Sequence, residues 1–218
     1  MLFLHTLVAY IILLALIILL ALTIFELTPM IYEYMLNNTR LQTGDIICTT
    51  NGAKNSLLGQ FWQWVGGFIP GEVDHMAIYI GPDGRCIEAA VKGVISFEIL
   101  DNQWDAEKMY PQRQLLDKPI GIAYPLAKQP FQPKTIEQIR AGVAYFCIAQ
   151  ELYEKPYNPL YFDPQLNSAY YCSQLMYKAY LAYGIDLSIG PSVTPVPHDA
   201  QVVLPQAIWQ NVHERKRI

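Results

Sequence analysis

The sequence predicts an α+β domain, with a small antiparallel sheet packed on helices, that follows an N-terminal transmembrane helix. Three observations predict this class. The first 25 residues are almost wholly apolar, two strand-like runs flank the turn Gly81–Gly84, and amphipathic helices begin near Pro133 and at Cys172. Alternating runs joined by a short Gly-containing turn indicate antiparallel strands, whereas apolar positions three and four apart indicate helices.

The segment from Leu2 to Phe25 contains no Lys, Arg, Asp or Glu. Because a helix needs about 20 apolar residues to cross a bilayer, we expect an uncleaved transmembrane anchor over residues 1–28. A cleaved signal peptide would need a basic start, a shorter apolar stretch and a small-x-small site, and none of these is present. The chain is therefore predicted to be a single-pass membrane protein. The first Lys or Arg is Arg40, so the positive-inside rule leaves the side of the membrane open.

Residues 29–40 are expected to form a linker, broken at Pro29, and residues 41–218 suit one domain. The aromatic segment 57–69 is expected to be a short helix that supplies core or forms a wall facing substrate or membrane. Residues 41–49 are predicted to form a turn followed by a strand, and further strands are predicted at 73–80, 85–91, 93–100 and 121–124, where β-prone residues run between turn signals.

The turn Gly81-Pro82-Asp83-Gly84 is a strong hairpin signal and fixes a register. Pairing across it sets Ala77 opposite Glu88. Side chains alternate along a strand, so His75 and Glu88 then lie on one face as diagonal neighbours, roughly 7–8 Å apart at the backbone. Their side chains are therefore expected to meet.

Two helices are predicted beyond the sheet. The first opens at Pro133 and ends before Pro156, and the second runs from Cys172 to Gly184, a residue suited to the end of a helix. The tail after Ile185 is rich in Pro and is expected to wrap the domain surface. Its basic end, Arg215–Arg217, is expected to be a solvated terminus rather than a contact with anionic lipid.

Composition excludes some classes of function. The chain has 15 Lys plus Arg against 19 Asp plus Glu and no basic stripe, so nucleic acid is not an expected partner. Its four Cys lack any C-x-x-C spacing, which disfavours a zinc site, and we expect neither a metal nor an organic cofactor. Cys48, Cys86 and Cys147 lie in apolar runs, where free Cys is ordinarily a small buried hydrophobe.

Cys172 has a different setting, because a polar stretch precedes it and an amphipathic helix follows. The positive end of a helix dipole favours the thiolate, which is the attacking form of Cys. An imidazole within reach, from His75, would complete an activated nucleophile, and Glu88 would orient that ring. The ordinary alternatives are a small buried Cys and a core His. His198 and His213 are weaker candidates for the base.

Five motifs together resemble the YiiX/YebB-like group of circularly permuted papain-like proteins, which are related to NlpC-type peptidoglycan hydrolases and more distantly to lecithin-retinol acyltransferases. They are Thr43-Gly44-Asp45-Ile46-Ile47, His75 through Gly81, Glu88-Ala89, Lys155-Pro156-Tyr157-Asn158, and Tyr171-Cys172-Ser173-Gln174-Leu175 through Asp186. The resemblance implies a permuted papain-like core over 41–218 and a triad of Cys172, His75 and Glu88. Together with the predicted anchor, it implies a place in the bacterial inner membrane. This chain departs from the group at Gln174, where an acidic residue is usual, and in its longer, Pro-rich C-terminal region.

These expectations lead to a membrane-anchored thiol hydrolase that cleaves an amide bond in a peptide, including cell-wall peptide. Two alternatives stay open. In the first, the substrate is an acyl ester or thioester of a lipid, which the anchor and Trp62, Trp64 and Phe68 favour. In the second, the domain is a non-catalytic, membrane-bound binding module that uses the same cleft.

Overall fold

A computed structural model describes residue 10 and residues 12–17, 30–52, 60, 71–159, 166–188 and 202–218. The chain divides into two compact units, Met1–Met30 and Ile31–Ile218. In the first unit, residues 10 and 12–17 are helical and exposed, Met30 is exposed and not helical, and most of the predicted anchor lies outside the described residues. Within the described ranges, no helix combines the length and the apolar character that crossing a bilayer requires.

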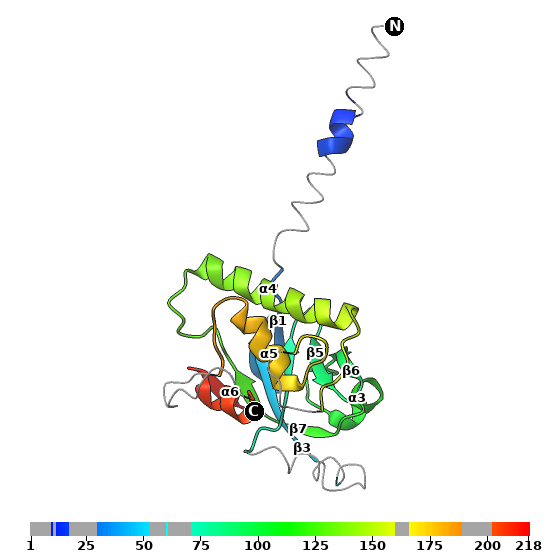
Figure 1. Cartoon of the computed structure of the whole chain (residues 1–218), viewed down its shortest axis with the longest axis vertical. Helices are drawn as coiled ribbons and strands as arrows, with labels where there is room; N and C mark the ends of the chain where they lie inside the picture. The colour runs from blue at the N-terminus through cyan, green and yellow to red at the C-terminus, as the bar shows by residue number, and fades with distance from the viewer. Residues whose placement is uncertain are drawn as a thin grey trace. The chain divides into compact units, whose positions relative to one another are not determined.

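The second unit is built on a six-stranded antiparallel sheet, which confirms the α+β prediction (Figure 1). The strand order is β6-β5-β4-β3-β7-β8. The strands are β3 (Ile46–Asn51), β4 (His75–Tyr79), β5 (Arg85–Ala90), β6 (Gly93–Glu98), β7 (Asp117–Ala123) and β8 (Arg215–Arg217). Every residue of β4 is buried, as expected of a strand with neighbours on both sides and cover on both faces.

The two faces of the sheet carry separate apolar clusters. One cluster joins the sheet to α4 (Pro133–Leu152), α5 (Cys172–Leu181) and α6 (Pro205–Asn211). The other joins it to α3 (Ala106–Arg113) and to the hairpin of β1 (Glu33–Leu36) and β2 (Thr39–Gln42). Figure 1 shows α4 crossing beside α5, and α3 lying near β6, which is one edge strand of the sheet. The domain therefore has three layers.

The predicted hairpin register is confirmed, because Ala77 pairs with Glu88. The turn is closed by a hydrogen bond from the Arg85 N–H to the Pro82 carbonyl. Gly84 has a φ of +80°, a conformation that favours glycine, and a Cβ there would lie 2.9 Å from the Ile99 carbonyl oxygen. The turn sequence thus fixes which side chains of β4 and β5 face each other.

The segment Thr43–Asp45, directly before β3, is hydrogen-bonded to helices α4 and α5. The Arg140 guanidinium of α4 donates to the Thr43 carbonyl and to Asp45 Oδ1, both at 2.7 Å. The Tyr180 hydroxyl of α5 donates to the Gly44 carbonyl. Gly44 has a φ of +94°, so the turn favours glycine at this position. This part of the family-like pattern is therefore structural.

Part of the expected linker at 29–40 is folded. Residues Glu33–Leu36 and Thr39–Gln42 form the β1-β2 hairpin, and Leu36 and Leu41 are fully buried in the cluster that includes α3. The hairpin was not predicted because its strands are only four residues long.

The C-terminal tail also differs from its prediction as a surface wrapping. Ile208 and Trp209 of α6 are buried among the residues of α5 and the sheet. The basic end is strand β8, which pairs with β7, and Arg217 donates to both oxygens of Glu72. The tail therefore completes the core and one edge of the sheet.

Candidate active site

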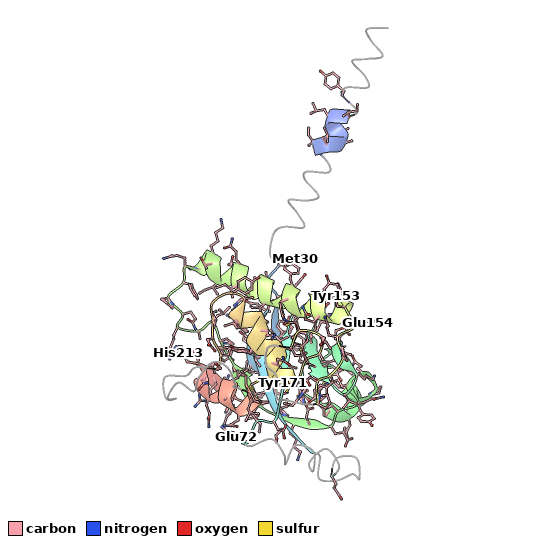
Figure 2. All side chains as sticks on the ribbon, in the orientation of Figure 1. Met30, Glu72, Tyr153, Glu154, Tyr171 and His213 are labelled. Atoms are coloured by element: carbon pink, nitrogen blue, oxygen red, sulfur yellow. The ribbon has the colours of Figure 1, made fainter. Side chains whose placement is uncertain are left out.

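The start of α5 is held in place by its own sequence. Cys172 is the first helical residue, and the Gln174 side chain accepts a hydrogen bond from the Tyr171 N–H at 3.3 Å. The same amide donates to the Leu166 carbonyl at 3.0 Å. Gln174, where the YiiX/YebB-like group usually has an acidic residue, is fully buried and caps the helix that begins at Cys172. Figure 2 labels Tyr171, the residue before this helix.

The motif around Pro156 fixes the approach to α5. The Tyr170 N–H donates to the Pro156 carbonyl at 3.0 Å, and the Asn158 N–H donates to the Tyr170 carbonyl at 2.9 Å. On the other side, the Val94 N–H of β6 donates to the Lys155 carbonyl at 2.8 Å. The motif therefore links the sheet to the residues directly before Cys172.

His75 is the first residue of β4, so it lies at an end of the sheet, beside both of its apolar faces. Met76 and Ile78 belong to the cluster of α4 and α5, whereas Ala77 and Tyr79 belong to the cluster of α3 and the hairpin. By that alternation His75 faces the side of Ala77, but it is the first residue of the strand. At this end its ring hydrogen-bonds to Cys172 of α5 and to Glu88 of β5.

The two ring nitrogens of His75 have different partners. Nε2 lies 2.9 Å from Glu88 Oε2, and an ionised carboxylate can only accept a hydrogen bond. Nε2 therefore carries the proton, and Nδ1 is the nitrogen left for Cys172. The structure brings all three predicted residues, Cys172, His75 and Glu88, into one hydrogen-bonded chain.

The electrostatics favour a charged imidazole. Burial by itself would lower the pKa of His75, which is 6% exposed. The charge and hydrogen bond of Cys172, and then those of Glu88, outweigh burial and raise the pKa of His75 to about 10. Cys172 is only 3% exposed, so water has little access to its thiol, and a charged His75 in contact with it would stabilise a thiolate.

Glu88 has no exposed surface, and burial alone would raise the pKa of its carboxyl. The Arg113 guanidinium and the hydrogen bond and charge of His75 act more strongly and lower this pKa to about 2. Arg113 is fully buried as well and also binds Asp117. Glu88 is therefore an ionised carboxylate inside the protein, held by one cation from α3 and one imidazole from β4.

Sequence reasoning missed Arg113 and Asp117. Arg113 ends a short helix that contains Pro111 and has few apolar positions, so no periodic pattern marks it. Its partner Glu88 lies 25 residues away in the sequence, and only tertiary folding brings the two together. The four-residue spacing from Arg113 to Asp117 was a weak signal that the pair could contact.

The remaining cysteines have no comparable surroundings. All four Cys are free and buried. Burial raises the pKa of the thiols of Cys48, Cys86 and Cys147, which keeps them protonated at neutral pH.

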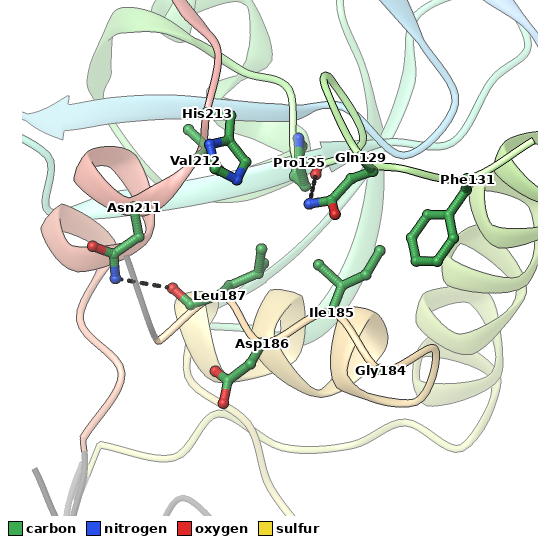
Figure 3. A pocket seen from close by; sticks show the side chains of 10 residues that line it. All are labelled: Pro125, Gln129, Phe131, Gly184, Ile185, Asp186, Leu187, Asn211, Val212 and His213. Atoms are coloured by element: carbon green, nitrogen blue, oxygen red, sulfur yellow. Dashed lines mark hydrogen bonds between the residues drawn. The ribbon is translucent and has the colours of Figure 1, made fainter. Parts of the chain in front are cut away.

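Other sequence candidates lie elsewhere. Trp62, Trp64, Phe68 and His198 are outside the described residues. His213 lines a separate cavity of about 290 Å³ between α6 and the end of α5, where Figure 3 shows the Asn211 amide donating to the Leu187 carbonyl. None of the triad residues lines this cavity. Among the described parts of the chain, no group of three or more His, Cys, Asp and Glu is arranged to hold a metal ion.

Comparison with known proteins adds no relative. No protein-family model, curated protein or solved structure matches the chain.

Replacing Glu88 with Gln is predicted to remove stability that depends on pH. The contribution of Glu88 is present above its ordinary pKa of 4.5 and is lost as the pH falls toward about 2. The contribution of His75 is present below its ordinary pKa of 6.5 and is lost as the pH rises toward about 10. The free energy of unfolding of wild type should therefore exceed that of Glu88→Gln most between pH 4.5 and 6.5.

Urea unfolding at a series of pH values measures this difference. Glu98→Gln is the matched control, because Glu98 is an exposed carboxylate on the neighbouring strand β6. The control should follow wild type throughout. A difference between wild type and Glu88→Gln that stays constant from pH 2 to 10 would contradict the assignment.

Proposed function

We propose that this protein is a thiol hydrolase in which Cys172 is the nucleophile, His75 the general acid and base, and Glu88 the residue that orients His75. The observation that carries the proposal is the buried chain from Cys172 through His75 to Glu88. It combines a thiol at a helix start, an imidazole in contact with it, and a carboxylate that holds the second ring nitrogen. These are the parts that activate a cysteine nucleophile.

The reaction follows from these contacts. The Cys172 thiolate attacks the carbonyl carbon of an amide and forms a carbon–sulfur bond. The oxyanion is stabilised by the backbone N–H of Cys172, which has no intrahelical acceptor at this position of α5. The imidazolium of His75 gives its proton to the leaving nitrogen as the carbon–nitrogen bond breaks, which leaves a thioester.

Hydrolysis then restores the starting state. His75 takes a proton from a water molecule that attacks the thioester carbonyl, and the carbon–sulfur bond breaks to release the acid. Glu88 keeps the proton on Nε2, so that Nδ1 remains the nitrogen that exchanges protons with the reacting groups. No step needs a metal ion or an organic cofactor.

We also propose that the fold is a permuted papain-like core of the YiiX/YebB-like type. The support is that several motifs of the resemblance have distinct roles in this domain. Thr43–Asp45 joins the helices to β3, Lys155–Asn158 fixes the approach to α5, and the remaining motifs carry the triad. The resemblance to NlpC-type hydrolases favours an amide in a peptide as the substrate, including cell-wall peptide.

Labelling with electrophiles tests this function. Full-length protein would be treated with peptidyl vinyl sulfones and with long-chain acyl fluoromethyl ketones, and modified residues mapped by mass spectrometry. We expect the peptidyl probes to modify Cys172, and Cys172→Ala to abolish labelling. Cys147→Ala removes another buried free thiol and should label as wild type does.

The outcomes separate the alternatives. Preferential labelling by the acyl probes would replace the peptide substrate with a lipid acyl group. Absence of labelling at Cys172 by either series, in protein that is folded, would favour a non-catalytic binding module.

We further propose that residues 1–28 anchor the protein in a membrane as a single span, because Leu2–Phe25 is apolar and uncharged. Full-length protein should stay in the membrane pellet after a carbonate wash, whereas a chain that lacks Met1–Thr28 should appear in the supernatant. Recovery of the full-length chain in the supernatant would rule out the anchor.

A further inference from the structure

Arg113 and Asp117 form the one fully buried ion network that touches the candidate triad within the described residues. We propose that Arg113, itself held by Asp117, is a positioning residue that sets the Glu88 carboxylate so that Oε2 serves His75. The proposal rests on the roles of Cys172 and His75 in the proposed function.

The contacts of Arg113 fix the rotation of the carboxylate. Its Nε donates to Oε1 and Oε2 of Glu88 at 3.0 and 3.1 Å, and its Nη2 donates to Oε2 at 2.6 Å. Oε2 is also the oxygen that lies 2.9 Å from His75 Nε2. Oε2 of Glu88 therefore contacts both the guanidinium and the imidazole, and Oε1 is held by Arg113 Nε.

Asp117 prevents Arg113 itself from turning. Nη1 donates to Asp117 Oδ1 and Nη2 to Oδ2, each at 2.9 Å, so the guanidinium is bound along two edges. The rings of Phe97 and Trp104 lie 4.4 and 4.7 Å from its central carbon. The Trp104 indole N–H donates to Asp117 Oδ1 at 3.0 Å. A planar cation bound at its edges and against aromatic rings has a single orientation.

The charges of the network also favour a charged His75. Glu88 faces Arg113 and His75, while Arg113 faces Glu88 and Asp117. Two carboxylates share one guanidinium, which leaves one negative charge, and a protonated His75 balances it. Without Asp117 the guanidinium would neutralise Glu88 alone, and less negative charge would remain to stabilise the imidazolium.

Stability alone does not explain such a network. Replacing a buried ion cluster with apolar residues of similar volume is often neutral or stabilising, because charges lose hydration on burial. Here the cluster lies beside an otherwise apolar layer of α3 and the hairpin. A role in orienting Glu88 accounts for the presence of three charged side chains at this place.

The test is a double-mutant cycle on the rate at which iodoacetamide alkylates Cys172 in the full-length protein in detergent. The rate is measured near pH ~6, where an ordinary thiol of pKa ~8.5 is almost wholly protonated. We expect Arg113→Lys, which keeps the charge but not the fork of donors, to slow alkylation about tenfold, the factor that one pKa unit gives. In the Glu88→Gln background, Arg113→Lys should cause no further slowing, so the double variant should react at the rate of Glu88→Gln alone.

Arg140→Lys is the matched control. Arg140 is the other buried arginine that binds a buried aspartate, but it pairs with Asp45 away from the triad. It should lower the melting temperature and leave the alkylation rate at the wild-type value. If Arg113→Lys behaves in the same way, or if its effect multiplies with that of Glu88→Gln, Arg113 does not act through Glu88 and the proposal is overturned.

Two further results keep the proposal separate from the proposed function. If Arg113→Lys does not fold, Asp117→Asn replaces it in the cycle, and an alkylation rate equal to wild type in that variant overturns the proposal. If wild-type Cys172 reacts as slowly as an ordinary thiol and Glu88→Gln changes nothing, the triad itself fails. Rapid alkylation that depends on both Glu88 and Arg113, with no labelling by the electrophile panel, would support the positioning role and reject the hydrolase.

Discussion

The rest of this structure depends on a carboxylate that is ionised inside the sheet. Glu88 has no exposed surface, so its charge must be met entirely by other side chains. Arg113 meets it from α3 and His75 from β4, and Asp117 on β7 holds Arg113 in turn. Three strands and one helix are therefore joined by one set of charges. Within the described residues, His75 is the member of that set that also contacts Cys172 of α5.

The position of His75 explains how a two-faced sheet supports one site. An interior residue of β4 would reach only one of the two apolar clusters, but the first residue of the strand lies at the end of the sheet. There the ring meets the start of α5, whose position is fixed by the Gln174 cap and by the hydrogen bonds of Tyr170. The thiol thus comes from α5 on one face of the sheet, the carboxylate of β5 lies on the other face, and the imidazole joins them.

Sequence reasoning succeeded where local chemistry decides the geometry. The Gly81–Gly84 turn fixes the β4-β5 register, so the contact between His75 and Glu88 followed from counting residues. It failed where tertiary packing decides. Arg113 lies in a helix interrupted by Pro111, and the Pro-rich tail gave no pattern for Trp209 because α6 is only seven residues long. Both segments gain their structure from the core that they complete rather than from their own periodicity.

If the buried network acts as proposed, it keeps His75 charged beside Cys172. Nuclear magnetic resonance of ring-labelled histidine measures this directly, with the His75 signal assigned by its loss in His75→Gln, since the chain has only 4 His. We expect His75 to titrate with a pKa of about 10. A pKa at or below the ordinary value of 6.5 would mean that burial outweighs Glu88 and Cys172, and it would contradict the account.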